Sequence, residues 1–213
     1  MIAIIDYGVG NLYSLSSSLK YIGLEAVVTN KADDLKKADK IILPGVGAFE
    51  DAIKKLKDSG LVSTIEEEVA KGKYMLGICL GMQLLFEKSF EYGQHSGLGF
   101  IKGEVASIEE DLPWHMDNGA RYKLKVPHIG WNRLNIKRDD PLFNYIEDGE
   151  HVYYVHSYYA RGCQEYILAS SIYDIEITGV VRNKNIYGTQ FHPEKSGKTG
   201  LNILRAFGEL EAK

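Results

Sequence analysis

The stretch that decides the fold is Lys73-Tyr74-Met75-Leu76-Gly77-Ile78-Cys79-Leu80-Gly81-Met82-Gln83. Its apolar run before Cys79 predicts a buried strand, and the amphipathic sequence after it (Met82, Leu84, Leu85, Phe86) predicts a helix. A strand, a sharp turn and a helix, with the nucleophile at the corner, form a nucleophile elbow. Such a turn holds the thiol clear of the sheet, near a helix N-terminus that favours the thiolate. The alternative interpretation is a buried structural cysteine before a glycine-rich turn.

A second stretch supplies the groups that a cysteine nucleophile needs, and it reads Thr189-Gln190-Phe191-His192-Pro193-Glu194-Lys195-Ser196. A base must take the thiol proton, and a third group must hold that base in the correct tautomer. His192 and Glu194 are residues of these two kinds. Together with Gly-Ile-Cys-Leu-Gly-Met-Gln, the Gln-Phe-His-Pro-Glu motif resembles the catalytic motifs of class I glutamine amidotransferases. The resemblance implies that Cys79, His192 and Glu194 hydrolyse the side-chain amide of glutamine. Cys163 follows Gly162 at an expected strand end and lacks the neighbours of Cys79, so it is not expected to be the nucleophile.

Length and composition indicate an ordinary globular protein rather than a nucleic-acid or membrane protein. The 213 residues fit a single domain, taken as 1–213, with 45% hydrophobic and 25% charged residues. A net charge of −4 gives no electrostatic case for binding nucleic acid or an anionic membrane. Two cysteines cannot form a disulfide framework, so a reducing compartment is expected. With no signal peptide and no membrane-spanning run, we expect a cytoplasmic protein.

Strands that alternate with helices in the first half predict a doubly wound α/β sheet. Strands are expected at Ile2–Asp6, Glu25–Thr29, Lys40–Leu43 and before Cys79, with helices from Leu12, at Asp33–Ala38 and twice between Glu50 and Lys71. Ligands of such sheets bind at the carboxyl ends of the strands. Asp6-Tyr7-Gly8, Pro44-Gly45-Val46-Gly47 and Cys79 all fall at such ends.

After about residue 97 the pattern becomes β-rich, which predicts an antiparallel C-terminal half for the same single domain. Strands are expected at Phe100–Ile108, Lys123–Asn135, Glu150–Ala160, Glu165–Tyr173, Ile175–Asn183 and Ile186–Gln190, with a closing helix at Lys198–Leu210. Asp111 to Arg121 is the most loop-like segment. No histidine has metal-ligand spacing, so neither a metal nor a cofactor is predicted.

The segment Pro44-Gly45-Val46-Gly47 resembles the oxyanion strand of the amidotransferases. Its alternative interpretation is a plain tight turn. The resemblance implies that backbone N–H groups there meet the charge that develops when a thiolate attacks an amide. The N–H groups of Gly47 and Leu80, the residue after the nucleophile, are the expected donors.

Three further stretches resemble the glutaminase subunits of imidazole glycerol phosphate synthase: Asp6-Tyr7-Gly8-Val9-Gly10-Asn11, Lys125-Val126-Pro127-His128-Ile129-Gly130-Trp131-Asn132 and Tyr153-Tyr154-Val155-His156-Ser157-Tyr158. The resemblance implies a heterodimer with a cyclase subunit, a (β/α)₈ barrel. That subunit uses the ammonia to make imidazole glycerol phosphate and an aminoimidazole carboxamide ribonucleotide in histidine biosynthesis. By the same resemblance, substrate glutamine contacts Gly47, Gln83, Ser157 and Tyr158. Lys195 and Tyr153 are the expected partner contacts.

Three alternatives stay beside this interpretation. One is the glutaminase of another class I amidotransferase, such as the pyridoxal phosphate synthase type, against which the Val126–Asn132 stretch argues. Another is a paralogue that serves a surface-sugar pathway with its own barrel partner. The sequence does not distinguish such a paralogue from a subunit of histidine biosynthesis. The third is a docking module without catalysis, which has no need for a complete Cys-His-Glu set.

Overall fold

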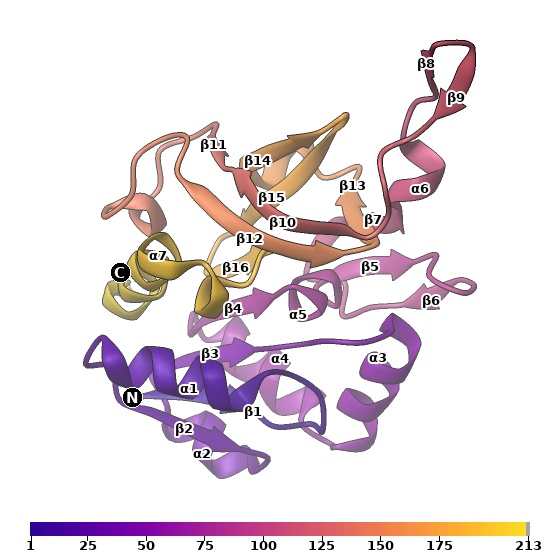
Figure 1. Ribbon diagram of the computed structural model, residues 1–213. Coiled ribbons are helices and arrows are strands. Elements are labelled where there is room, and N and C mark those ends of the chain that lie inside the picture. Colours follow the sequence, from indigo (N-terminus) through magenta and orange to yellow (C-terminus); the bar gives the residue numbers. More distant parts are fainter. Residues whose placement is uncertain (212–213) are drawn as a thin grey trace.

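A mixed sheet of eight strands runs through the computed structural model, which describes residues 1–211 (Figure 1). In sheet order the strands are β11 (Asn135–Ile136), β14 (Ile167–Tyr173), β15 (Ile175–Asn183), β16 (Ile186–Thr189), β4 (Tyr74–Ile78), β3 (Lys40–Leu43), β1 (Ile2–Ile5) and β2 (Ala26–Thr29). The strands from β16 to β2 pair in parallel, whereas β11, β14, β15 and β16 pair antiparallel. This confirms the predicted parallel centre and antiparallel C-terminal half.

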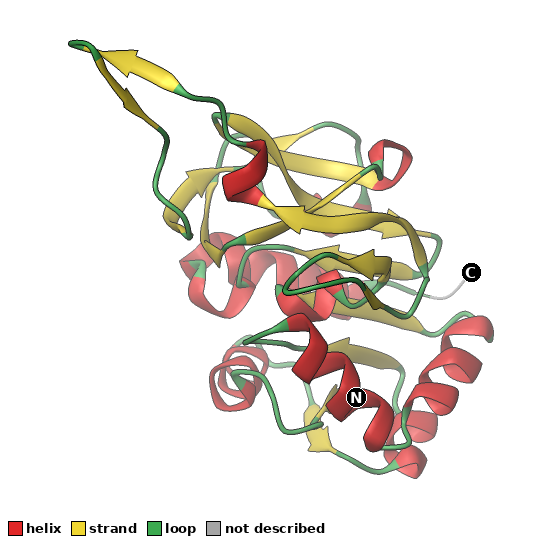
Figure 2. Cartoon of the chain, turned by 90° about the vertical axis from the view of Figure 1, so that its right-hand side faces the viewer, coloured by secondary structure: helices red, strands yellow, loops and turns green. Residues whose placement is uncertain are grey.

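Helices cover both faces of the parallel part, because its strands are apolar on both sides. Ile2 and Ile4 face α1 (Leu12–Tyr21) and the closing helix α7 (Gly197–Glu209). Ala3 and Ile5 face the opposite layer, which contains α2 (Ala32–Lys37), α3 (Phe49–Asp58) and α4 (Val62–Ala70). Figure 2 shows the two helical layers with the sheet between them. The expected doubly wound arrangement is therefore present.

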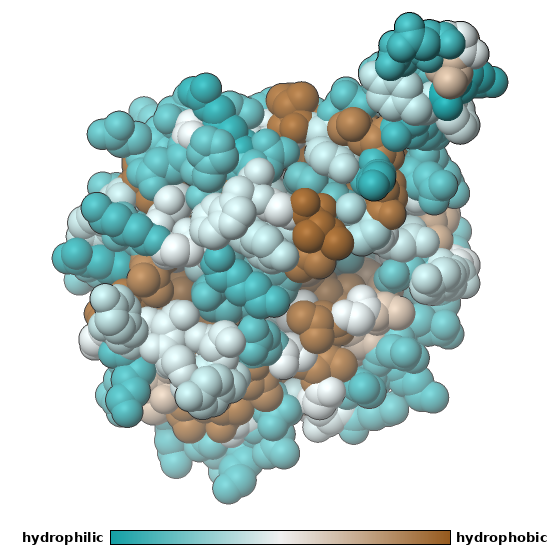
Figure 3. All heavy atoms as spheres, viewed as in Figure 1, coloured by the Kyte–Doolittle hydropathy of each residue, from teal (hydrophilic) through white to brown (hydrophobic). Residues whose placement is uncertain are grey.

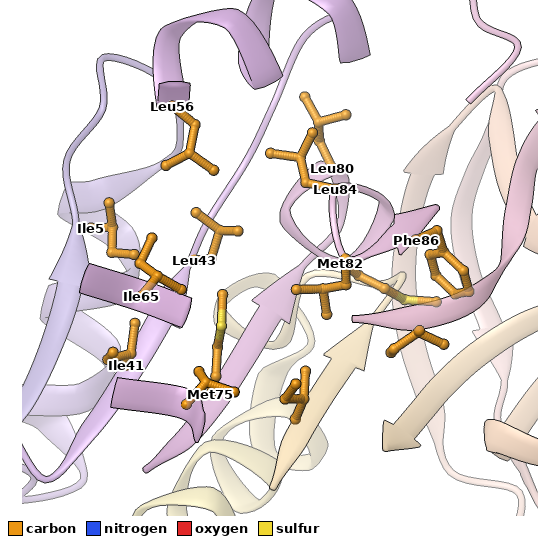
Figure 4. Close-up of a cluster of buried hydrophobic side chains, with 14 of the residues drawn as sticks. Ile5, Ile41, Leu43, Leu56, Ile65, Met75, Leu80, Met82, Leu84 and Phe86 are labelled. Atoms are coloured by element: carbon orange, nitrogen blue, oxygen red, sulfur yellow. The ribbon is translucent and has the colours of Figure 1, made fainter. Parts of the chain in front are cut away.

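The spacing of apolar residues explains how α3 attaches to the sheet. Phe49, Ala52, Ile53 and Leu56 are buried, whereas the flanking lysines are exposed. Figure 4 shows Leu56 of α3 and Ile65 of α4 beside sheet residues Ile5, Ile41, Leu43 and Met75. Each fully buried aliphatic side chain of this kind contributes roughly 1.5–3 kcal/mol to folding.

Smaller sheets lie against the antiparallel half. One has the order β13 (Tyr158–Arg161), β7 (Ile101–Ser107), β5 (Phe86–Ser89) and β6 (His95–Ser96). Another pairs β10 (His128–Arg133) with β12 (His151–His156). The expected strand over 150–160 is thus interrupted at Ser157, and the one over 123–135 is shorter than predicted. Three 3₁₀ turns, η1 (Pro141–Phe143), η2 (Gln164–Tyr166) and η3 (Pro193–Lys195), connect these elements.

The helix predicted after Cys79 is wrong in extent. Helix α5 covers only Leu80–Gln83, and the chain then turns into β5. The backbone carbonyls of Leu84 and Leu85 accept hydrogen bonds from the N–H groups of Leu98 and of Ile101, the first residue of β7. Tertiary pairing of this backbone therefore replaces further helical turns.

The expected loop over 111–121 also differs from the structure. It follows α6 (Ile108–Asp111) and contains a hairpin of β8 (His115–Asp117) and β9 (Ala120–Tyr122). Asn118 and Gly119 both have positive φ, 47° and 78°, as the tight turn between two strands requires. The hairpin projects from the body, and its surface is mostly hydrophilic (Figures 2 and 3). Asn-Gly is a hairpin signal that the sequence analysis did not use.

No helix among residues 1–211 is long and apolar enough to cross a bilayer. The last two residues of the predicted domain, 212 and 213, lie outside the described residues.

Candidate active site

Three neighbouring strands deliver the predicted catalytic segments to one edge of the sheet. Cys79 directly follows β4, His192 comes three residues after β16, and the Pro44–Gly47 segment follows β3. Strand β4 pairs in parallel with both β16 and β3, so these chain ends lie side by side (Figure 1). The order of strands in the sheet thus joins motifs that are more than a hundred residues apart.

The backbone at Cys79 has the strained geometry of an elbow, with φ 54° and ψ −112°. A non-glycine residue in such a conformation persists only where the surroundings hold it. The Cys79 N–H donates to the carbonyl of Thr189 at 2.7 Å, and its carbonyl accepts from the N–H of Gln83 at 3.1 Å. Side chain and backbone of Cys79 are buried, yet the thiol borders the cavity described below.

The glycines around the elbow are required by close backbone packing. A Cβ at Gly81 would lie 1.9 Å from the carbonyl oxygen of Leu43, and one at Gly77 would lie 2.7 Å from that of Gly81. A Cβ at Gly45 would lie 2.6 Å from the amide nitrogen of Gly81. The oxyanion segment and the elbow therefore pack backbone to backbone, which only glycine allows.

The side chain of His192 is buried and anchored to Glu194, with 2.9 Å between Nδ1 and Oε1. The loop is held by the His192 N–H, which donates to the carbonyl of Tyr153, and by the Ser196 hydroxyl, which donates to the carbonyl of His192. Burial opposes a charge on the imidazole. Hydrogen bonding and charge from Cys79 and Glu194 outweigh it and raise the pKa of His192 to about 10. His192 is thus favoured in its protonated, imidazolium form between Cys79 and Glu194.

One cavity of about 370 Å³ brings most of the predicted site residues together. It is lined by Val46, Gly47, Cys79, Leu80, Gln83, Glu91, Pro127, Val155, His156, Ser157, Tyr158, His192 and Lys195. Glu194 lies behind His192 rather than in the cavity wall, as suits a group that orients a base. Tyr153 is also outside this wall, and its ring packs edge-on against Trp131 with 6.1 Å between centroids.

Gln83 is held by the protein through its amide nitrogen. Nε2 donates to the carbonyl of Tyr158 at 2.9 Å and to Oε1 of Gln190 at 3.0 Å. Both N–H groups are therefore used, which leaves Oε1 as the atom able to meet a ligand.

Cys163 is placed away from this cavity. It is buried, its sulfur lies 3.8 Å from the Thr178 hydroxyl, and burial raises its pKa to about 11. Both cysteines are free thiols.

Three polar neighbours of the cavity or of the nucleophile were not predicted from the sequence. The amide of Gln190 is fully buried, with Nε2 3.8 Å from the sulfur of Cys79. Glu91 presents a carboxylate whose pKa is raised by burial, and its Oε2 accepts from the N–H of Phe49. His156 is the third. Gln190 lay within a quoted motif, and no pattern around Glu91 signalled its position.

Within the described part of the chain, no three His, Cys, Asp or Glu side chains are grouped so as to hold a metal ion.

The fold and the Cys-His-Glu arrangement define a class of enzyme, and comparisons with known proteins agree with it. The family model for "Glutamine amidotransferase class-I" matches residues 3–209, so the chain belongs to that family. A solved "Crystal structure of glutamine amidotransferase" has a similar fold, with a TM-score of 0.73 at 19% identity, covering 98% of this chain and 100% of that one. A "Structure of PurLQS from Thermotoga maritima" gives 0.70 at 19% identity, covering 97% and 96%.

Much nearer relatives specify the group within the family. The chain is 50% identical to "Imidazole glycerol phosphate synthase subunit HisH" of Listeria monocytogenes serotype 4a, over 99% of this chain and 96% of that one. The protein of the same name from Caldanaerobacter subterraneus subsp. tengcongensis is 48% identical, over 99% and 98%. At this identity over whole lengths, the chain falls among the HisH subunits of imidazole glycerol phosphate synthase. The predicted family and fold are confirmed.

Proposed function

We propose that this chain hydrolyses L-glutamine to glutamate and ammonia, and that it delivers the ammonia to a cyclase subunit in a heterodimer. The cyclase would use it to form imidazole glycerol phosphate and an aminoimidazole carboxamide ribonucleotide in histidine biosynthesis, in the cytoplasm. The observation that carries the proposal is the position of His192, held by Glu194 at 2.9 Å and sharing one cavity with Cys79. The name shared by the two HisH relatives supports the partner.

In the proposed reaction, the thiolate of Cys79 attacks the δ-carbonyl carbon of glutamine. His192, as imidazolium, protonates the departing amide nitrogen, so that ammonia leaves and a glutamyl thioester remains. Neutral His192 then takes a proton from water, whose oxygen attacks the thioester carbonyl. Collapse of the intermediate releases glutamate and expels the Cys79 thiolate, so the thiolate and imidazolium of the starting site are restored. Glu194 holds the imidazole through Nδ1 and stabilises its positive charge in both steps.

The backbone N–H groups of Gly47 and Leu80 are proposed to donate to the oxyanion of each tetrahedral intermediate. Leu80 is the first residue of α5, and the first N–H groups of a helix have no partner within it. Gly47 has a φ of 95°, a conformation that lets its peptide face the cavity and that L side chains rarely adopt. Losing one such donor typically lowers the rate roughly 10²–10³-fold.

Substrate recognition is assigned to Ser157 and Tyr158, which line the cavity together with Cys79. Oε1 of Gln83 is the acceptor left for a substrate N–H. Glu91 supplies a carboxylate for the α-ammonium group of an amino acid. On the rim we propose that Lys195, which is exposed, and Tyr153 contact the cyclase subunit.

The proposal is tested by measuring glutamate release by the purified chain, alone and with a candidate cyclase subunit that has its ribonucleotide bound. Stimulated release and co-elution of the two chains are expected. Release that is unaffected by the cyclase, or a different barrel subunit recovered when the chain is purified from its own cell, would contradict the proposed partner. Failure of glutamine to be hydrolysed under all conditions would contradict the enzyme activity itself.

A further inference from the structure

The side chains of His128 and His156 form a buried pair that the proposed reaction does not use. Strands β10 and β12 place the two residues opposite each other, and Nδ1 of His128 lies 3.1 Å from Nε2 of His156. Both residues are less than a tenth exposed, at 3% and 7%. His156 also lines the cavity of the candidate active site. A buried polar pair of this kind needs complete hydrogen bonding, which specifies the proton positions.

Asn132 fixes the proton positions at one end. Its Oδ1 accepts from the N–H of Arg133 at 2.8 Å, and its Nδ2 donates to the carbonyl of Ile172 at 3.0 Å. The amide orientation is therefore determined, and Nδ2, 3.3 Å from Nε2 of His128, can only donate to it. His128 must accept at Nε2 and, as a neutral ring, carry its proton on Nδ1, which donates to His156.

The carbonyl of Tyr158 fixes the proton positions independently at the other end. It lies 2.8 Å from Nδ1 of His156 and can only accept. His156 therefore carries its proton on Nδ1 and accepts at Nε2, as the bond from His128 requires. Burial lowers the pKa of His128 to about 4 and that of His156 to about 3, so both rings are neutral at pH 7. The two ends demand the same pair of tautomers.

The chain of hydrogen bonds continues from Tyr158 to the nucleophile. The Tyr158 carbonyl also accepts from Nε2 of Gln83, whose second N–H donates to Oε1 of Gln190. This orientation directs Nε2 of Gln190 toward the sulfur of Cys79, at 3.8 Å. In this series of hydrogen bonds, from Asn132 to Cys79, every donor meets an acceptor. A flipped Gln190 amide would bring its NH2 group against the NH2 group of Gln83 and would turn its oxygen toward the sulfur of Cys79.

We propose that Gln190 donates a hydrogen bond to the thiolate of Cys79, and that His128 and His156 are positioning residues that hold this donor in place. The proposal rests on the assignment of Cys79 as the nucleophile. An N–H aimed at the sulfur stabilises the thiolate over the thiol, so the nucleophile is formed more readily. The histidines act at a distance: they order the Tyr158 carbonyl, which orders the Gln83 amide, which prevents Gln190 from flipping.

The first test measures the rate at which iodoacetamide alkylates Cys79 in the full chain at pH 7, with the labelled peptide identified. Gln190→Met keeps the volume but removes the donor, and the rate should fall about 10-fold, within the range of hydrogen bonds to charged groups. Gln190→Glu places a carboxylate beside the sulfur and should lower the rate further. If Gln190→Met does not fold, Gln190→Asn, which is too short to reach the sulfur, takes its place.

Tyr154→Phe is the matched control. The Tyr154 ring stacks on His128 with 4.8 Å between centroids, and its hydroxyl bonds to that of Ser171. The variant therefore loses a buried hydrogen bond beside the same histidine but keeps every hydrogen bond between Asn132 and Cys79. Its alkylation rate should stay within twofold of the wild type.

The positioning role is tested by rescue at His156. His156→Leu should slow alkylation of Cys79 about as much as Gln190→Met, whereas His156→Asn retains a donor near the position of Nδ1 and should recover most of the rate. In the complex with its partner, the same variants should lower kcat for glutamine hydrolysis more than they change KM.

The outcomes separate the inference from the proposed function. Absence of labelling at Cys79 in the wild type would overturn both. Labelling of Cys79 at wild-type rate in Gln190→Met, or equal rates in His156→Leu and His156→Asn, would overturn the inference and leave the proposed function intact.

Discussion

Nδ1 of His192 lies 2.9 Å from Oε1 of Glu194, and both side chains are 3% exposed. Only Pro193 separates them in sequence, and the 3₁₀ turn η3 brings Glu194 back beneath the imidazole. The pair leaves Nε2 of His192 for the cavity side. With the thiol of Cys79 as its other neighbour, the imidazole is flanked by two groups that can both carry negative charge.

This relationship predicts how stability depends on alkaline pH. The pKa of His192 is raised from 6.5 to about 10 in the folded chain, so the native state binds a proton that the unfolded state releases above pH 6.5. The resulting stabilisation is complete below pH 6.5 and is lost as the pH rises toward 10. Glu194→Gln removes one cause of the shift, so its unfolding free energy should fall less steeply between pH 7 and 10.

Urea unfolding at several pH values checks this prediction. Glu209→Gln is the control, because Glu209 pairs with Arg205 on an exposed helix face and does not contact His192. Parallel stability curves for the wild type and Glu194→Gln would show that the pair does not hold the extra proton.

A second prediction concerns the division of labour between the subunits. Cys79→Ala removes the nucleophile, so synthesis from glutamine by the reconstituted complex should be lost, while synthesis from added ammonium salt should continue. Cys163→Ala, which changes a buried thiol outside the cavity, should retain glutamine-dependent synthesis. Loss of both activities in an assembled Cys79→Ala complex would refute this division.

The elbow glycines give a third prediction. A methyl group at Gly81 would lie 1.9 Å from the carbonyl oxygen of Leu43, a rigid backbone atom. We expect Gly81→Ala to destabilise the chain by roughly 1–3 kcal/mol and to abolish glutamine hydrolysis, since the elbow must move.

Gly208→Ala is the comparison for this variant. Its Cβ would meet the flexible end of the Leu24 side chain at 2.4 Å, which can shift, so the effect should be smaller and activity should remain. Normal glutaminase activity in Gly81→Ala would mean that the close packing of the elbow against the backbone of Leu43 is not needed for activity.

A fourth prediction concerns docking of the cyclase at Lys195, which is exposed and borders the cavity. Exposed ion pairs contribute about 0–1 kcal/mol, so Lys195→Ala should raise the dissociation constant for the cyclase by at most about fivefold and weaken its stimulation of glutamine hydrolysis. Lys198→Ala, an exposed change in α7 outside the cavity, should leave both unchanged. If Lys195→Ala binds the cyclase and is stimulated by it as the wild type is, Lys195 is a solvated lysine with no role in docking.

Elements whose residues carry strong local patterns were predictable from the sequence. The continuous apolar runs at β1 and β3 and the apolar periodicity of α3 specify their own secondary structure, because burial on two faces or on one helical stripe demands it. The elbow was predictable for a similar reason, since glycines at 77 and 81 mark a close backbone approach. Strand bounds at Lys40–Leu43 and Ile175–Asn183 match the prediction.

Features that depend on tertiary partners were not predictable in this way. Residues after Gln83 are apolar at helical spacing, yet they form β5 because β7 offers hydrogen-bond partners to that backbone. Glu91 reaches the cavity only through the path of the chain after β5. The proton positions along His128 and His156 depend on Asn132 and on a backbone carbonyl, neither of which has a signature in the sequence.

The last prediction concerns the oxyanion segment. The hydroxyl of Tyr7, buried just after β1, donates to the carbonyl of Pro44 at 2.7 Å. Burial, and after it the charge of Cys79, raises the pKa of Tyr7. The hydrogen bond to Pro44 ties the first peptide of the Pro44–Gly47 segment to the sheet, so it limits how far that backbone can rotate. Tyr7→Phe removes only the hydroxyl, and it leaves the Pro44 carbonyl without this donor.

We expect Tyr7→Phe to lower kcat for glutamine hydrolysis in the stimulated complex by about 10-fold, as misplacement of an oxyanion donor weakens transition-state binding, with little change in KM. Tyr159→Phe is the control, because its hydroxyl bonds to Asp111 away from the oxyanion segment. Both variants lose one buried or partly buried hydrogen bond, so their unfolding free energies should fall by similar amounts, roughly 0.5–1.5 kcal/mol. An unchanged kcat in Tyr7→Phe, or an equal loss in Tyr159→Phe, would show that the Tyr7–Pro44 bond serves stability alone.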